Sequence, residues 1–197
     1  MPLIQKLRNV NFAMIIYYMD IKLGNLSIVP ASDHPELLGV SVAAFLSTFP
    51  DADKIGVVEI DPEISGTSKF CEFYKTKMDQ AANCVVIEAS RTDRKWLAAC
   101  LILGSTRADI NGLARKTLDA RKASFAQMEK AVTETGMEYG AITPLGLPKE
   151  WPILIDSAVV NSEAIIIGSG IRKSKLVLQG NILAKLTNAI VLEGLGK

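Results

Sequence analysis

The sequence predicts a mixed α/β fold of the α+β kind, in which helices flank a curled, mixed β-sheet. The 197 residues suffice for one substantial domain with a packed core. Of these residues 49% are hydrophobic and 22% are charged, which is typical of globular proteins. Helical periodicity dominates the first part of the chain, and short β-type runs follow one another in the last part. Because this order lacks the regular alternation of a doubly wound sheet, we expect strands of mixed direction.

The first 30 residues are predicted to be an N-terminal appendage, and the domain to cover residues 31–197. The apolar run at residues 12–19 lacks a cleavage-site pattern and is far shorter than the about 20 residues that a membrane span needs. A packed strand or helix is the favoured interpretation of this run, and a membrane anchor is the alternative.

Two helices are predicted in the first part of the domain. One begins at Asp33, where Glu36 stands at capping-box spacing and apolar residues recur at helical intervals as far as Phe49. The other begins at Thr67 and Ser68, which are most simply its caps. The N-terminus of this second helix could alternatively face a pocket and favour an anion.

Two further helices are expected in the middle of the chain. A short one is capped by Asp109. The next begins with Ser124 and Gln127 at capping-box spacing and ends at Gly136, a residue type common just after a helix.

The strands are predicted from short runs rich in β-branched and aliphatic residues. The first covers residues 54–61, and the polar turn from Arg91 to Arg94 joins residues 83–90 and 95–105 into a hairpin. Four more runs follow at residues 141–146, 151–157, 163–170 and 174–180. A small helix and a last strand are expected to close the chain.

Composition and motifs exclude several kinds of chemistry. The net charge of +1 provides no basic surface for long nucleic-acid tracks, so any such contact should be local. Three cysteines without a CxxC pair favour reduced thiols and a cytoplasmic location. A single histidine, His34, makes a histidine-based metal site or a catalytic relay improbable, and no cofactor is expected. The run GSGIRKS at residues 168–174 precedes a strand, whereas a dinucleotide-binding loop precedes a helix.

The segment TGMEYGAITPLGLPKEWPILIDSAVVNSEAIIIGSG, residues 135–170, concentrates glycine and proline where little charge is present. It contains a helix end in Thr-Gly, a G-x-x-x-P loop with a glycine soon after, an apolar strand ending in Asp, and a glycine-rich turn. The matching residues are Thr135, Gly136, Gly140, Pro144, Gly146, Asp156, Gly168, Ser169 and Gly170. In order and spacing they resemble the YbaK/ProX family, the stand-alone relatives of the editing domain of bacterial prolyl-tRNA synthetases. The resemblance extends from Ala31 to about Leu195.

The resemblance implies a barrel-like core around the curled sheet and hydrolysis, in trans, of the ester in a mischarged aminoacyl-tRNA. The partner implied is the 3′ end of an aminoacyl-tRNA, with a synthetase as a second candidate partner. The alternative is a catalytically silent module of the same fold that binds a nucleotide, an aminoacyl compound or a protein.

Gly140 is the first predicted catalytic residue, through its backbone amide. A residue without a Cβ lets its N–H approach a substrate closely, and oriented donors can stabilise the charge that develops on an ester carbonyl. Pro144 would set the direction of the loop and restrict Thr143 before it. Both are assigned to substrate binding, and the alternative is that Gly140 and Pro144 only shape a turn.

Asn83 is the second predicted catalytic residue, and it departs from the family pattern, which has a lysine there. Asparagine offers a neutral amide that donates and accepts hydrogen bonds but carries no charge. Lys75 and Lys77 on the preceding helix could replace the lysine only by reaching round to the site. Asn83 could instead be a helix C-cap or a strand-entry residue.

The other candidates each have a structural alternative. Asp156 could accept a hydrogen bond from a substrate amine or ribose hydroxyl, or from neighbouring backbone. Ser169, between Gly168 and Gly170 in the predicted binding turn, could bond a ribose hydroxyl or only the turn. Arg107 could contact phosphate or remain solvated. Cys84, in a predicted strand, is more simply an inert thiol than a nucleophile.

Overall fold

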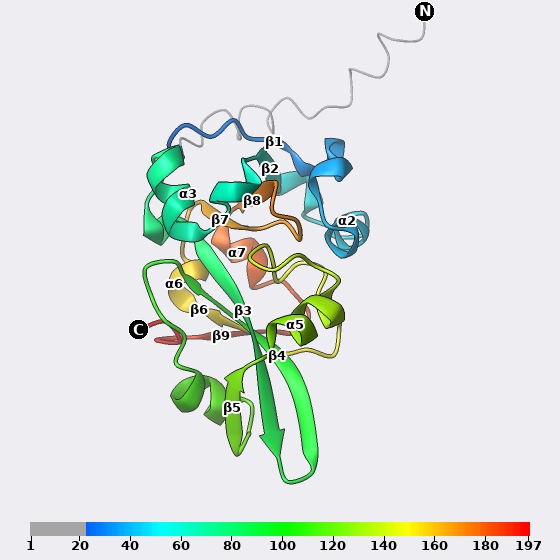
Figure 1. Cartoon of the computed structure of the whole chain (residues 1–197), viewed down its shortest axis with the longest axis vertical. Coiled ribbons are helices and arrows are strands. Elements are labelled where there is room, and N and C mark those ends of the chain that lie inside the picture. The colour runs from blue at the N-terminus through cyan, green and yellow to red at the C-terminus, as the bar shows by residue number, and fades with distance from the viewer. Residues whose placement is uncertain (1–22) are drawn as a thin grey trace, which may run out of the picture.

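The computed structural model describes residues 23–197, and it confirms a mixed α+β fold with short helices around two β-sheets (Figure 1). The prediction for residues 12–19 lies outside the described residues. No helix among residues 23–197 has the length and apolar character needed to cross a membrane.

The first sheet has four antiparallel strands in the order β1-β2-β8-β7. They are β1 (Val29–Pro30), β2 (Gly56–Glu59), β8 (Ser174–Leu178) and β7 (Ile165–Gly168). Every residue of β7 and β8 is buried, so these two strands form the interior of the molecule at this end.

The second sheet has five strands in the order β5-β3-β4-β6-β9 and is mixed, as the sequence predicted. They are β5 (Lys122–Phe125), β3 (Ala82–Arg91), β4 (Arg94–Leu103), β6 (Ile153–Asp156) and β9 (Ala189–Leu192). β3 pairs antiparallel with β4 and β5, whereas β6 pairs parallel with β4 and β9. The long β3–β4 hairpin extends to the end of the molecule opposite the first sheet (Figure 1).

The two sheets meet where β3 begins. A parallel bridge joins Ala81, just before β3, to Ile166 of β7. The largest buried apolar cluster also combines both sheets, with Val57 and Leu176 from one and Leu101 and Ile155 from the other. The predicted curled sheet is therefore a pair of sheets that share a core.

The helices are short. They are α2 (Val40–Leu46), α3 (Thr67–Tyr74), α4 (Arg115–Thr117), α5 (Met128–Thr135), α6 (Ser157–Val160) and α7 (Gly180–Leu183), with a π-helical turn at Ile110–Ala114 before α4. Single 3₁₀ turns occupy Ala31–Asp33, Pro35–Leu37, Ala52–Lys54, Pro62–Ile64 and Met78–Gln80.

In the first part of the chain one predicted helix start is wrong, whereas the second helix begins at Thr67 as predicted. No capping box forms at Asp33 and Glu36, because Pro35 opens a separate 3₁₀ turn and the helix begins only at Val40, after an extended Gly39. Thr67 and Ser68 are not caps either, since the residue before α3 is Gly66, which makes no side-chain cap.

Of the two helix starts predicted in the middle of the chain, one is confirmed and the other is wrong. Asp109 is confirmed as a cap, because its carboxylate accepts hydrogen bonds from two backbone N–H groups of the helix. Ser124 lies within β5 rather than at a helix start, and Gln127 precedes α5 without a side-chain bond. Gly136 ends α5 in the left-handed region, with φ +64°, as predicted.

The strand predictions are confirmed except for residues 141–146. This run forms a loop, in which Gly146 has a φ of +86°. Its residues are largely buried all the same, so the apolar pattern reflects packing of a loop rather than a strand.

Residues 23–30 pack against the domain. The Leu23 side chain is 2% exposed and belongs to a cluster with Phe70 and Val177. The Asn25 N–H donates to the Tyr74 carbonyl at 2.9 Å, which fixes this segment to the end of α3.

Candidate functional site

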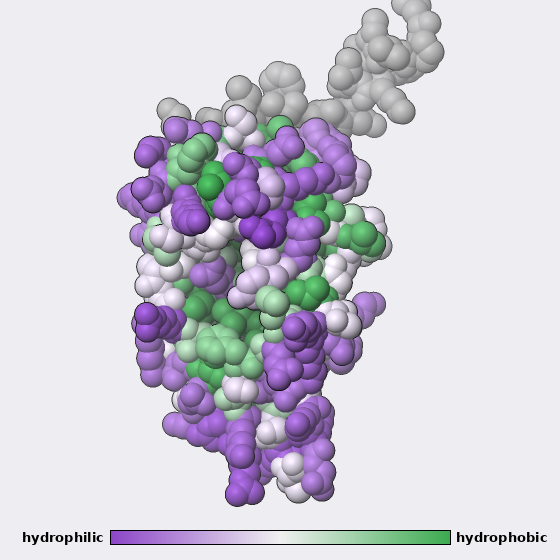
Figure 2. All heavy atoms as spheres, viewed as in Figure 1, coloured by the Kyte–Doolittle hydropathy of each residue, from purple (hydrophilic) through white to green (hydrophobic). Residues whose placement is uncertain are grey.

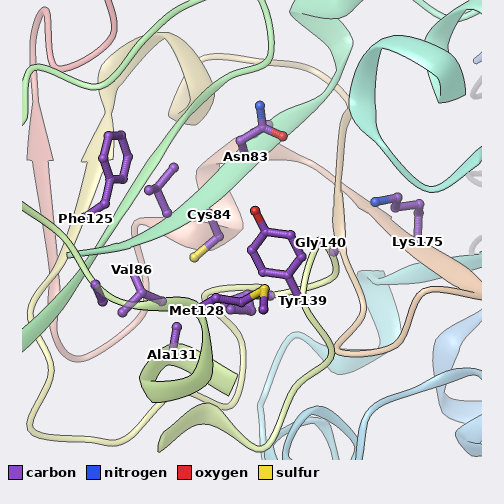
Figure 3. Close-up of a pocket in the computed structure, with 14 residues that line it drawn as sticks. Asn83, Cys84, Val86, Phe125, Met128, Ala131, Tyr139, Gly140 and Lys175 are labelled. Atoms are coloured by element: carbon purple, nitrogen blue, oxygen red, sulfur yellow. The ribbon is translucent and has the colours of Figure 1, made fainter. Parts of the chain in front are cut away.

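A pocket of about 420 Å³ opens beside the first half of β3 (Figure 3). Its walls come from β3, β5, α5, the loop after α5 and the paired strands β7 and β8. The lining residues are Ala82, Asn83, Cys84, Val85, Val86, Phe125, Ala126, Met128, Ala131, Tyr139, Gly140, Ile142, Gly168 and Lys175. The pocket thus lies where the two sheets meet.

Gly140 lines this pocket with an unbonded amide. Its N–H makes no hydrogen bond to any of residues 23–197, and it lies in an exposed loop. Its φ of +85° favours glycine, although a Cβ built there would meet nothing within 4 Å. Glycine is therefore needed at this position for backbone conformation, not for lack of space.

Backbone contacts hold the Gly140 loop against the turn after β7. The Glu138 N–H donates to the Gly170 carbonyl at 2.9 Å, and the Gly170 N–H donates to the Ala141 carbonyl at 2.9 Å. At Gly168 a Cβ would collide with the Ala141 carbonyl oxygen, so only glycine permits this close packing. Two glycines of the predicted binding turn thereby position the loop, and Gly168 also lines the pocket.

Asn83 is the second residue of β3, and its side chain is held by α3. The Thr67 hydroxyl donates to Asn83 Oδ1 at 2.6 Å. The oxygen is engaged by this bond, whereas the Nδ2 amide makes no hydrogen bond with the described residues and remains available as a donor. The residue lies within a strand, so the helix C-cap alternative is wrong.

Lys175 also lines the pocket, and the sequence analysis missed it. It lies in β8, directly opposite Gly168 of β7, and is 7% exposed. Its Nζ is 6.0 Å from the centroid of the Phe70 ring and forms no ion pair or hydrogen bond with the residues that the structure describes. One signal was available, because a lysine inside the buried strand SKLVL is unusual.

Burial sets the charge state of this lysine. The pKa of Lys175 is lowered from 10.5 to about 8, mainly by desolvation; Cys71 partly opposes this shift, and Arg172 adds a smaller lowering effect. Lys175 therefore remains mainly an ammonium at neutral pH. Lys75 and Lys77, the substitutes considered from the sequence, are exposed and do not line the pocket.

The pocket has a polar side and an apolar side. Figure 3 shows the Asn83 amide, Gly140 and the Lys175 ammonium on one side, and Val86, Phe125 and Ala131 on the other. Around the pocket the side chains of Phe125, Met128 and Tyr139 are 66%, 51% and 64% exposed. Figure 2 shows hydrophobic surface in the middle of the same face of the molecule, framed by hydrophilic residues.

Cys84 is a poor nucleophile in this environment. Burial, with a smaller effect from Cys100, raises the pKa of the Cys84 thiol well above its ordinary value. The thiol therefore stays protonated at neutral pH. Among residues 23–197 no group of three or more His, Cys, Asp or Glu side chains is arranged to hold a metal ion.

Three other predicted residues near the loop do not reach the pocket lining. Thr143 is fully buried, and its hydroxyl has no hydrogen-bond partner among the described residues. Pro144 is buried and lies at a second cavity of about 590 Å³ that also includes Phe45 and Leu147. Ser169 is fully buried, and its hydroxyl lies 2.7 Å from the Ser174 hydroxyl and 2.9 Å from the Ile171 carbonyl.

Asp156 and Arg107 lie outside the pocket lining as well. The Asp156 carboxylate accepts hydrogen bonds from the N–H groups of Ala158 at 2.8 Å and Gly196 at 2.6 Å. It thereby caps α6 and ties the C-terminal segment to β6. Arg107 is exposed, and its backbone pairs with that of Lys197 in both directions. The structure thus brings Asn83, Gly140 and Gly168 together at the pocket.

The site is therefore a pocket between two sheets with a glycine-rich loop at its edge. The model of the aminoacyl-tRNA editing domain family matches residues 61–186, and the chain belongs to this family. Among solved structures, one titled "Crystal structure of a putative trans-editing enzyme for prolyl tRNA synthetase" superposes with a TM-score of 0.67 at 18% identity. That match covers 85% of this chain and 98% of the other.

A second solved structure, of a hypothetical protein named APE2540, superposes with a TM-score of 0.64 at 16% identity. It covers 72% of this chain and 90% of the other. At these identities the superpositions establish the shared fold.

Proposed function

We propose that this protein hydrolyses, in trans, the ester bond of mischarged aminoacyl-tRNA, with the terminal aminoacyl-adenosine in the 420 Å³ pocket. The observation that carries the proposal is that the Gly140 N–H, at the pocket lining, has no hydrogen-bond partner within residues 23–197. Membership of the editing-domain family supports the choice of substrate class.

Hydrolysis of an aminoacyl ester requires oriented hydrogen-bond donors rather than a strong base. The ester carbonyl oxygen accepts a hydrogen bond from the Gly140 N–H, which stabilises the negative charge that develops as water adds to the carbonyl carbon. The bond between that carbon and the ribose oxygen then breaks, the ribose oxygen takes up a proton, and the free amino acid leaves. The vicinal ribose hydroxyl of the substrate orients the water.

The apolar side of the pocket suits the side chain of the acyl group. Val86, Phe125, Met128 and Ala131 supply this wall, and no carboxylate is found among the lining residues that the structure describes. A positively charged amino-acid side chain would find no counter-charge there. Small to medium apolar acyl groups are therefore the expected substrates.

A deacylation assay with Gly140→Ala tests this function on a panel of mischarged tRNAs. Alanine at a φ of +85° is strained, so the loop should shift and the amide should lose its aim at the ester. Loss of one such donor typically lowers kcat by roughly 10² to 10³. The measurement is single-turnover hydrolysis of the aminoacyl ester.

Gly194→Ala is the matched control. Gly194 also has a positive φ, +74°, and open space around its Cβ position, but it does not line the pocket. We expect it to lose comparable stability, on the order of 1 kcal/mol, while it retains activity. If both variants were equally active, the Gly140 amide would not be the group that acts on the ester.

The catalytically silent binding module remains the second candidate because Asn83 replaces the family lysine. Asn83→Lys separates the two functions in the same assay. Turnover by the wild type supports the hydrolase, whereas turnover that appears only in Asn83→Lys supports the silent module. If folded wild type and Asn83→Lys are both inactive on every tRNA, hydrolytic editing is contradicted.

A further inference from the structure

We infer that Lys175 binds the 5′-phosphate of the terminal adenosine of the tRNA, and so supplies from β8 the positive charge that position 83 lacks. This inference rests on the proposed function for the identity of the ligand. The evidence for the charge itself is the placement of Lys175 in the pocket.

The strand pairing places Lys175 beside Gly140. β8 pairs with β7 so that Lys175 stands opposite Gly168, and the Ala141 carbonyl lies against Gly168. Because Gly168 has no side chain, the loop packs directly on β7 at this point. The lysine, Gly168 and Gly140 consequently line one side of the pocket (Figure 3).

The Lys175 ammonium has no counter-charge within residues 23–197. Among the described residues no carboxylate comes within 4.0 Å of its Nζ, and the centroid of the Phe70 ring on α3 lies 6.0 Å from it. An unpaired ammonium is unfavourable in a buried strand. The position of this unpaired ammonium at a pocket is best explained by a ligand that carries a negative charge.

On the polar side of the pocket, the lining residues that the structure describes include donors and no carboxylate. Asn83 Nδ2, the Gly140 N–H and the Lys175 ammonium belong to lining residues and make no hydrogen bond with the residues that the structure describes. Such a set favours an oxyanion. The acyl side chain fits the apolar wall and the ester lies at Gly140, so the nucleotide lies on the side of Asn83 and Lys175. The 5′-phosphate of that nucleotide is therefore the anion that binds to Lys175.

Calorimetric binding of two stable substrate analogues tests the inference. The first is 3′-amino-3′-deoxyadenosine 5′-monophosphate that carries alanine or valine in amide linkage. The second is the same compound without the 5′-phosphate. We expect the wild type to bind the phosphorylated compound about 10- to 100-fold more tightly, as a charge-assisted hydrogen bond would provide.

Lys175→Met should abolish this preference and leave the affinity for the unphosphorylated compound nearly unchanged. Methionine preserves most of the volume of the side chain, and thermal unfolding checks that the variant folds. Lys175→Gln is a second variant with the same expectation. Lys173→Met is the matched control, because Lys173 is exposed, precedes β8 and does not line the pocket.

Moving the positive charge from position 175 to position 83 should restore the preference for the phosphorylated compound. The double variant Asn83→Lys/Lys175→Met returns an ammonium to the pocket from β3, and it should recover much of the phosphate preference. A merely structural role of Lys175 would not be rescued in this way.

Two results would overturn the inference. One is a wild type that does not distinguish the two analogues, and the other is an equal loss of affinity for both in Lys175→Met. Wild-type hydrolysis together with either result would leave the proposed function intact. Conversely, phosphate binding that depends on Lys175 in a protein that never hydrolyses an ester would contradict the hydrolase and retain the inference.

Discussion

At the scale of single residues, Lys175 couples stability to pH. Its pKa of about 8 in the folded protein lies below the value of 10.5 expected in the unfolded chain. Between these values the unfolded chain binds more protons, so the free energy of unfolding rises as the pH rises from about 8 to about 10.5. Below pH 8 the charged lysine lowers stability by on the order of 3 kcal/mol.

Lys175→Met should therefore stabilise the protein at neutral pH. We expect the free energy of unfolding to increase by up to about 3 kcal/mol at pH 7, and by much less at pH 10, where the wild-type side chain is mostly neutral. Urea unfolding of both proteins at the two pH values measures this. A variant less stable than the wild type at pH 7 would show that the ammonium is stabilised by the fold.

The sequence left two roles open for Asp156, contact with substrate and hydrogen bonds to neighbouring backbone, and the structure shows backbone bonds. Its two oxygens accept from the N–H groups of Ala158 and Gly196, and its side chain is 5% exposed. Asp156→Ala leaves both donors without partners, which should lower the free energy of unfolding by about 3 kcal/mol. Urea unfolding measures this loss.

Asp156→Asn is the paired variant for that experiment. Its amide can still accept from the Ala158 N–H but presents a donor to the Gly196 N–H, so an intermediate loss is expected. Hydrolysis by the folded fraction should be unchanged in both variants. A stable Asp156→Asn with impaired hydrolysis would instead place the carboxylate in contact with substrate.

At the scale of elements, β5 and α5 together build the apolar wall of the pocket. The sequence predicted one helix that begins at Ser124, whereas residues 122–125 pair with residues 87–90 of β3. Phe125 therefore ends a strand and Met128 begins a helix, and both line the pocket. A local capping pattern could not reveal this, because pairing with β3 depends on a segment more than 30 residues earlier.

Met128 should influence which acyl groups are accepted. Met128→Ala removes a half-exposed side chain from the wall and widens the apolar side of the pocket. We expect kcat/KM for bulkier apolar acyl groups to rise by about 10-fold relative to small ones, as for a change of one or two methylenes in such pockets. Competition between differently mischarged tRNAs measures the ratio.

Phe73→Ala is the control for this substitution. Phe73 is 62% exposed on α3 and does not line the pocket, so the ratio should stay at its wild-type value. An unchanged ratio in Met128→Ala would mean that the acyl side chain does not lie against α5.

At the scale of the whole molecule, the sequence predicted the mixed fold and most strands. Of the predicted site residues, Asn83, Gly140 and Gly168 line the pocket, whereas Pro144, Asp156, Ser169 and Gly170 do not. Glycine patterns and apolar runs are local signals, and they persist in the structure. Lys175 was missed because its place depends on β8 pairing between β2 and β7, which spacing does not encode. The boundary predicted between residues 30 and 31 stays a prediction, although Leu23 and Asn25 already contact the domain.

Charge balance over the whole chain limits how the protein can bind tRNA. The chain has 22 lysines and arginines against 21 acidic residues, so long-range attraction to a polyanion is weak. Most of the affinity should therefore come from the 3′ end. We expect full-length mischarged tRNA to bind no more than about 10-fold more tightly than an aminoacylated CCA fragment.

The dependence of tRNA affinity on salt concentration tests quantitatively whether most of the affinity comes from the 3′ end. Each phosphate neutralised on a single strand contributes about 0.7 to the slope of log K against log salt concentration. If one or two phosphates are neutralised at the pocket, the slope should be about −1 for the wild type. In Lys175→Met the slope should be shallower by about 0.7, the contribution of one phosphate. A slope steeper than about −4, or a 100-fold advantage of full-length tRNA, would require a basic tRNA-binding surface away from the pocket. In that case affinity would depend on charges that the near-neutral balance does not suggest, and Lys175 would be a minor contributor.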